Sequence, residues 1–291
     1  LNVIALVCPP VLYRGRLEFL KWFLKEECFK EISSLRANYI ISTGASVAGL
    51  NHLIARDGYA KSLVAMKPGF LPLNRFDFVF LPKHDWPEGK KAERPVILTN
   101  AAPNLINPEY LKEQSELLLS HFSHLKGKVR TKIGILIGGD SKHVFLSENM
   151  LKMIVNQLKQ LIREMNIDLL ITTSRRTPAS IEQLLFREFK KDPNCPLLIL
   201  ANQEHVPEAF GGILGLSDIL IVSGDSVSMI SEAASTGKNT IVFYPEGKTA
   251  SNEKNNKFRS FIDHLSTDGF ILATDVQNLN PAAVAALYPT R

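Results

Sequence analysis

Residues 220–233 read LIVSGDSVSMISEA, and this stretch decides the fold of the second half of the chain. The apolar run from Ile219 to Val222 predicts a buried strand, which ends at Gly224, where a segment with the apolar spacing of a helix begins. Small residues from Ala233 to Gly237 let this helix pack closely, and another strand is expected at Thr240 to Tyr244. The stretch therefore predicts a strand, a tight turn and a helix within a parallel α/β sheet.

The polar residues at this turn point to an anion site. We expect Asp225 or Ser226 to cap the helix, so that N–H groups of its first turn, near Ser228 and Met229, are open to a ligand. Glu232 follows nearly two turns later, where a carboxylate suits ribose hydroxyls. Nucleotide-sugar binding is one explanation. The other is structural, because any βαβ unit needs a helix cap and small residues where its helix meets the sheet.

Composition indicates a globular protein with two domains. The chain has 291 residues, of which 45% are hydrophobic and 22% charged. Its net charge is +5 and its pI is about 9.0. This mild, scattered excess favours phosphorylated partners or anionic membrane surfaces and is too small to argue for nucleic acid.

The three cysteines are far apart and lack the spacing of a metal site, which fits a reducing, cytoplasmic compartment. No apolar run approaches the roughly 18 to 20 residues that a membrane span requires. The chain starts at Leu1 inside an apolar segment, without an initiator methionine or a signal-peptide start. We expect that the true N-terminus is missing.

The first half alternates between strands and helices. A strand is expected at 3–7 and an amphipathic helix with an aromatic face at 17–32, either buried against a sheet or docked on a membrane surface. Further strands are expected at 39–42, 62–66, 76–81 and 96–99.

Polar residues gather at the ends of these strands, where parallel sheets bind ligands. Thr43, Gly44 and Ser46 follow the strand at 39–42, and Lys67 ends the strand at 62–66. The small residues allow a ligand to approach the backbone. His84 and Asp85 follow the strand at 76–81, and this pair suits a general base, although a histidine satisfied within a turn explains it too.

A helix is expected from Pro108 to about Leu125. The segment 126–131 after it is short, basic and free of large apolar residues, so we place the domain boundary there. The predicted domains are 1–128 and 129–291.

The second domain starts with a strand at 133–137 and the loop Gly138-Gly139-Asp140-Ser141, whose glycines let backbone approach a phosphate or sugar. A helix at 147–164 and strands at 169–173 and 197–200 follow. Ser174, Arg175 and Arg176 end the strand at 169–173. Two adjacent arginines suit a phosphate, and a structural salt bridge is the alternative.

Three motifs give the chain a family resemblance. Ser174-Arg175-Arg176-Thr177-Pro178, Asp225-Ser226-Val227-Ser228-Met229 with Glu232-Ala233, and Pro82-Lys83-His84-Asp85 resemble the mitochondrial-fission ELM family. Bacterial members of that family are regarded as glycosyltransferases of the GT-B fold. The resemblance implies two Rossmann-like lobes with parallel sheets facing a cleft, and it runs from about Tyr39 to Phe243.

The resemblance also implies roles for the residues named above. The C-terminal lobe would hold the donor nucleotide sugar at Gly138, Gly139, Ser141, Ser174, Arg175, Arg176, Gly224, Asp225, Ser226, Ser228, Met229 and Glu232. The N-terminal lobe would hold the acceptor near Thr43, Gly44, Ser46 and Lys67, with His84 or Asp85 activating its hydroxyl. The sequence lacks the DxD motif of metal-dependent glycosyltransferases, so we expect no metal and no cofactor besides the donor. The family's glycine-rich N-terminal opening has no counterpart here.

Three functions stay open. The first is transfer of a sugar to a cell-envelope lipid or saccharide, with the protein in the cytoplasm or peripheral at the inner membrane. The second is a non-catalytic adaptor, as the plant members suggest. The third is a nucleotide-sugar epimerase, which shares the two-lobed fold. The arginine pair and Glu232 favour ligand binding over an adaptor and do not separate the two enzymes.

Overall fold

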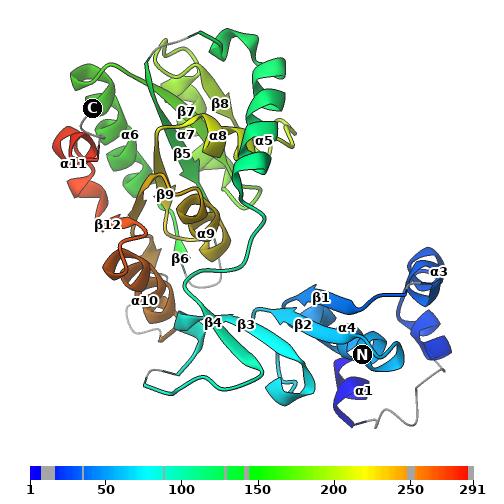
Figure 1. The fold of residues 1–291 in the computed structure, drawn as a ribbon. Coiled ribbons are helices and arrows are strands. Elements are labelled where there is room, and N and C mark those ends of the chain that lie inside the picture. The colour runs from blue at the N-terminus through cyan, green and yellow to red at the C-terminus, as the bar shows by residue number, and fades with distance from the viewer. Residues whose placement is uncertain are drawn as a thin grey trace. The chain divides into compact units, whose positions relative to one another are not determined.

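The computed structural model describes residues 1–7, 17–34, 36–87, 89–127, 130–140, 144–247 and 253–287, with side chains from 258 onward in the last range. The chain divides into two compact units, an N-terminal unit of Leu1–Pro103 and a C-terminal unit of Asn104–Arg291. Each has its own parallel sheet, which confirms the α/β class (Figure 1). A cleft between the two sheets stays a prediction.

The N-terminal unit contains a four-stranded parallel sheet in the order β1-β2-β3-β4. Its strands are β1 (Tyr39–Thr43), β2 (Lys61–Ala65), β3 (Phe78–Pro82) and β4 (Val96–Thr99), close to the predicted ranges. Helix α4 (Ala45–Asp57) connects β1 to β2 and buries Ala48 and Leu53 in one core with Val64 and Val79. Short 3-10 turns η2 (Leu73–Arg75) and η3 (Lys83–Asp85) flank β3.

The strand predicted at 3–7 is wrong, because this segment forms helix α1 (Asn2–Val7). A short apolar run does not distinguish a strand from a helix, so packing decides. Asn2 accepts the Gly49 N–H at 2.8 Å and donates to the Ala45 carbonyl at 2.8 Å, which fixes α1 against α4. A side chain at Gly49 would collide with Asn2, since its Cβ would lie 2.4 Å from Asn2 Oδ1.

The single helix predicted at 17–32 is wrong as well. The segment forms a 3-10 turn η1 (Leu17–Trp22) and helix α3 (Glu26–Ser34). Leu20 and Phe29 are buried, whereas Trp22 is 84% and Phe23 52% exposed. The aromatic face, for which burial against a sheet and docking on a membrane surface were the two alternatives, is therefore split between the core and the solvent.

The C-terminal unit contains a six-stranded parallel sheet in the order β12-β10-β9-β5-β7-β8. Its strands are β5 (Thr131–Ile137), β7 (Ile167–Thr173), β8 (Leu197–Ile199), β9 (Ile219–Ser223), β10 (Asn239–Phe243) and β12 (Leu272–Thr274). The chain runs outward from β5 to β8, then returns to the other side of β5 and continues to β12. This is the Rossmann strand order, with its switch point between β5 and β9.

Helices cover both faces of this sheet (Figure 1). They are α5 (Pro108–His121), α6 (Glu148–Glu164), α7 (Ala179–Phe189), α8 (Ala209–Leu216), α9 (Val227–Ser235), α10 (Glu253–Thr267) and α11 (Pro281–Ala285), with 3-10 turns η4 (Ser123–Leu125) and η5 (Val276–Asn278). A short antiparallel pair joins β6 (Val144–Phe145) to β11 (Glu246–Gly247).

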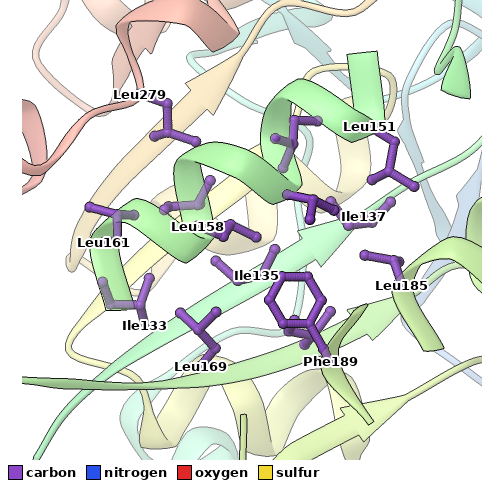
Figure 2. Close-up of a cluster of buried hydrophobic side chains, with 14 of the residues drawn as sticks. Ile133, Ile135, Ile137, Leu151, Leu158, Leu161, Leu169, Leu185, Phe189 and Leu279 are labelled. Atoms are coloured by element: carbon purple, nitrogen blue, oxygen red, sulfur yellow. The ribbon is translucent and has the colours of Figure 1, made fainter. Parts of the chain in front are cut away.

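A large hydrophobic core of the C-terminal unit includes the space between β5 and α6 (Figure 2). Ile133, Ile135 and Ile137 alternate along β5 and point to one face, as the period of a strand requires. Leu151, Leu158 and Leu161 recur along α6 on the facing side. Helix α6 begins where Ser147 accepts the Met150 N–H at 3.1 Å. The predicted strand–helix unit at this point is confirmed.

The division of the chain falls at Pro103/Asn104, before the boundary predicted at 128/129. Helix α5 was assigned to the first domain, but it packs against α8 of the C-terminal unit. Glycines on α8 make this close contact possible: a Cβ at Gly212 would lie 2.6 Å from Leu118, and one at Gly215 would lie 2.1 Å from Ser115 Oγ. The basic segment after α5 thus follows a helix that already belongs to the C-terminal unit.

We predict that Gly215→Ala destabilises the C-terminal unit by about 1–3 kcal/mol, the usual cost of overpacking a close contact. The added methyl would also meet the Leu111 carbonyl oxygen at 2.6 Å, and backbone cannot move aside as a flexible side chain does. Thermal unfolding should show a melting temperature several degrees lower. Gly58→Ala is the control, because its nearest neighbour is at an ordinary 3.5 Å and its change should be small. An unchanged Gly215→Ala protein would contradict the close α5–α8 contact.

Candidate functional site

A cavity of about 700 Å³ lies at the carboxyl ends of β7, β8 and β9. This is the edge of the sheet at which Rossmann folds bind their ligands. One wall is polar and comes from the end of β7 and the start of α9. The other is largely apolar and comes from the end of β8 and the start of α8, with Ile199, Ala201, Val206, Pro207 and Phe210. The cavity thus combines a polar and an apolar half.

The start of α9 forms part of the polar wall. Ser226 is the N-cap, and its hydroxyl accepts the Met229 N–H at 3.4 Å. Of the two predicted capping residues, Ser226 is therefore the correct one. The first intrahelical bond runs from the Ile230 N–H to the Ser226 carbonyl, so the N–H groups of Val227 and Ser228 precede the helical ladder. Ser226, Ser228 and Met229 line the cavity.

Asp225 has a structural role instead. Its carboxylate is 2% exposed and accepts the Ser223 hydroxyl at 2.5 Å and the Gly139 N–H at 2.9 Å. Arg176 donates to the same carboxylate at 3.4 Å. Burial raises the pKa of Asp225, and the three donors act against that shift. Asp225 joins the exits of β5, β7 and β9.

The glycines after β5 belong to this network. Gly138 N–H donates to Ser223 Oγ at 2.6 Å, so the two N–H groups predicted to approach a phosphate already have protein partners. A Cβ at Gly138 would lie 2.1 Å from Asp225, and one at Gly139 would lie 2.2 Å from the Arg176 backbone. These glycines are required for packing between loops. Gly224 is also packed, since its Cβ would lie 2.7 Å from the Phe243 carbonyl oxygen.

Ser141, the remaining residue predicted in this loop, lies outside the described residues.

The two arginines after β7 differ in their surroundings. They occupy the centre of a turn closed by the Thr177 N–H, which donates to the Ser174 carbonyl at 2.9 Å. Arg176 bonds Asp225 and the Asp140 carbonyl, so the structural alternative holds for this residue. Arg175 is exposed and lines the cavity, and it makes no hydrogen bond or ion pair within the described part of the chain. Arg175 is therefore the arginine available to an anionic ligand.

Glu232 lies on α9 at the cavity wall and is half-buried. Burial raises the pKa of its carboxyl above the ordinary value of 4.5. Among the described residues nothing donates a hydrogen bond to it. A carboxylate held in this way is suited to accept hydrogen bonds from the hydroxyls of a ligand.

The largely apolar wall contains residues that belong to none of the motifs predicted to bind a ligand. Glu204, His205, Val206 and Phe210 all line the cavity. The loop that carries them is fixed by the buried Glu182, which accepts the Thr173 hydroxyl at 2.6 Å and the Asn202 N–H at 3.3 Å. The only signal in the sequence was the polar run at the end of β8.

The predicted residues of the N-terminal unit share the carboxyl edge of their own sheet. Thr43 and Ala65 are paired at the ends of β1 and β2, so Gly44 and Ser46 lie beside the loop of Lys67. Gly44 has a φ of +78° and open space around it, as a position for close approach requires.

His84 and Asp85 follow β3 in η3. The His84 Nε2 and Asp85 Oδ2 atoms are 3.8 Å apart, and the His84 side chain is 7% exposed. A general-base role stays a prediction.

A family model described as mitochondrial fission ELM1 matches residues 12–291. The chain belongs to the mitochondrial fission ELM1 family. The match covers both units, so the resemblance of the three motifs is confirmed.

This ELM1-family chain is similar to proteins from a bacterium and a plant. It is 25% identical over 280 residues to an uncharacterised protein of Rickettsia prowazekii, which covers 86% of this chain and 75% of the relative. It is 28% identical over 189 residues to the mitochondrial fission protein ELM1 of Arabidopsis thaliana, which covers 58% of this chain and 42% of the relative. The chain therefore spans less than half of the plant protein.

Solved structures also align with this ELM1-family chain. A Listeria monocytogenes structure named for UDP-N-acetylglucosamine 2-epimerase has a TM-score of 0.49 and 13% identity, covering 89% of this chain and 68% of that one. A glycosyltransferase of Rickettsia africae has a TM-score of 0.42 and 13% identity, covering 97% of this chain and 78% of that one.

Across the described ranges, no helix has both the length and the apolar character to cross a bilayer.

We predict that Glu232→Gln raises the melting temperature of the ligand-free protein at neutral pH. Because the pKa of Glu232 is raised on folding, the unfolded chain ionises first, from about pH 4.5, and the native state loses stability as the pH rises through the raised pKa. Glutamine does not titrate. The gain should be largest above the raised pKa and should shrink as the pH falls below about 4.5.

Thermal unfolding measured from pH 4 to pH 8 tests this. Glu204→Gln is the matched control, because Glu204 lines the same cavity but is exposed, and the exchange should leave the melting temperature unchanged. If Glu232→Gln melts below the wild type at pH 7, the ionised carboxylate stabilises the protein, and burial does not raise the pKa of Glu232 as stated.

Proposed function

We propose that this protein is a glycosyltransferase that binds a nucleotide sugar in the C-terminal cavity and transfers the sugar to a cell-envelope lipid or saccharide. The observation that carries the proposal is that three complementary groups line one cavity: the α9 N-terminus at Ser226, Arg175, which has no partner among the described residues, and the half-buried Glu232. The volume of the cavity, about 700 Å³, lies within the range of small-molecule sites.

In this proposal the diphosphate, the ribose and the base of the donor occupy successive parts of the cavity. The diphosphate binds at the N–H groups of Val227 and Ser228, with Arg175 beside it, because helix starts and guanidinium groups both favour phosphate. Glu232 accepts hydrogen bonds from the ribose. The base lies along the apolar wall at Val206 and Phe210.

These same groups favour departure of the nucleoside diphosphate. Negative charge develops on the diphosphate as the glycosidic bond breaks, and fixed N–H dipoles with Arg175 stabilise that charge without a metal. His84 or Asp85 accepts the proton of the attacking hydroxyl, with Thr43, Gly44, Ser46 and Lys67 holding the acceptor. The absence of a DxD motif agrees with a metal-independent reaction.

We predict that Arg175→Ala weakens binding of the matching nucleoside diphosphate by about 10- to 150-fold, which corresponds to one charge-assisted hydrogen bond. Isothermal titration with UDP, GDP, CDP and ADP identifies the base. The corresponding nucleoside lacks phosphates, so its affinity should be unchanged in Arg175→Ala. Arg187→Ala is the control, because Arg187 bonds Glu188 on α7 and does not line the cavity. Failure of all four nucleotides to bind at millimolar concentration would favour the adaptor function.

We predict that removal of the general base, by His84→Ala where His84 is the base or by Asp85→Asn where Asp85 is, lowers sugar transfer about 100- to 10,000-fold and keeps nucleotide affinity, because the general base does not take part in donor binding. The measurement is release of nucleoside diphosphate from the matching nucleotide sugar, with and without an envelope extract as acceptor. Asp85→Asn is tested beside it to separate the two candidate bases. Conversion of the nucleotide sugar to an isomer without release of nucleoside diphosphate would instead identify an epimerase.

A further inference from the structure

Helix α5 brings a tyrosine to the neighbourhood of the cavity. The helix packs on the glycine-containing face of α8, and a Cβ at Gly211 would lie 2.9 Å from the Tyr110 hydroxyl oxygen. Gly211 directly follows Phe210, which lines the cavity. Gly211 thus allows Tyr110, a residue that the sequence placed in the other domain, to pack on α8 next to the position of Phe210, although Tyr110 is not itself among the residues that line the cavity.

The segment before α5 is attached to α9, the helix that carries Glu232. Asn104 donates to the Ser235 hydroxyl at 3.0 Å. Ser235 lies three residues after Glu232, so both side chains are on the same side of α9. The start of α5 is also fixed, because the Asn107 side chain accepts the Tyr110 N–H at 2.8 Å. Tyr110 is therefore held from both directions, by α8 and by the segment attached to α9.

The electrostatics agree with this placement. Burial raises the pKa of Tyr110, and the negative charge of Glu232 raises it further, with a smaller contribution from Glu113. The two groups are thus within electrostatic range in a partly buried place. The tyrosine stays protonated at neutral pH and keeps its hydrogen as a donor, while the Glu232 carboxylate contributes only acceptors.

We propose that Tyr110 is a specificity-determining residue of the nucleotide site, which together with Glu232 recognises the vicinal hydroxyls of a ribose. The inference rests on the proposed function. A carboxylate accepts hydrogen bonds from both hydroxyls of a vicinal diol, and a protonated phenol donates to the oxygen of one of them. Tyr110 and Glu232 together therefore select ribonucleoside diphosphates over those that lack a hydroxyl.

The test compares Tyr110→Phe with the wild type, since this change removes only the hydroxyl. Isothermal titration uses the nucleoside diphosphate that binds tightest among UDP, GDP, CDP and ADP, together with its 2′-deoxy and 3′-deoxy forms. Tyr244→Phe is the matched control, because the Tyr244 hydroxyl donates to Asp263 on α10, a helix that contributes no described residue to the cavity wall. Circular dichroism verifies that both variants are folded.

We expect Tyr110→Phe to weaken the ribonucleotide by about 3- to 10-fold, as loss of one neutral hydrogen bond does, and to leave one deoxy form unaffected. Tyr244→Phe should change none of the three affinities. Equal weakening of all three ligands, or of none, overturns the role of Tyr110 while wild-type binding preserves the proposed function. Absence of nucleotide binding by the wild type overturns both.

Discussion

The buried carboxylate of Asp225 joins three strand exits of the C-terminal sheet, and the geometry of the candidate site depends on it. Through Ser223, the Gly139 N–H and Arg176, it fixes the loops after β9, β5 and β7 relative to one another. A buried carboxylate is costly unless donors surround it, and here they come from different parts of the chain. Since each donor is supplied by a different loop, displacement of any one loop removes one of the three donors of the buried carboxylate.

This network explains why adjacent arginines have different roles. Arg176 is committed to Asp225 and Asp140, so its charge is used within the protein. Arg175 occupies the neighbouring position of the same turn and faces the cavity. The turn of Ser174 to Thr177 therefore places one guanidinium in the framework and leaves the next one for a ligand. Gly138 and Gly139, which follow β5, belong to the same network, because their N–H groups donate to Ser223 and Asp225.

Glu232 has the opposite character to Asp225. It is partly desolvated, and its carboxylate receives no hydrogen bond from the described residues, so its ionised form costs stability in the absence of a ligand. Functional sites commonly retain such unfavourable groups, because a ligand that supplies the missing donors recovers the cost. The contrast between these carboxylates, seven residues apart, separates the supporting part of the site from the ligand-binding part.

The sequence by itself determined the repeated strand–helix units, because long apolar runs and polar residues at helix starts act locally, whereas the choice of Ser226 over Asp225 as the cap of α9 came from the structure. It also determined the polar residues after the strands, such as Ser174 and Arg175 after β7, and Ser228 and Glu232 on the helix that follows β9. Only the tertiary structure decided that 3–7 is a helix, that α5 belongs to the C-terminal unit, and that Gly138 and Gly139 pack against other loops. These outcomes depend on contacts between distant residues, such as Asn2 with Gly49 or Ser115 with Gly215, and such contacts leave no periodic pattern in the chain.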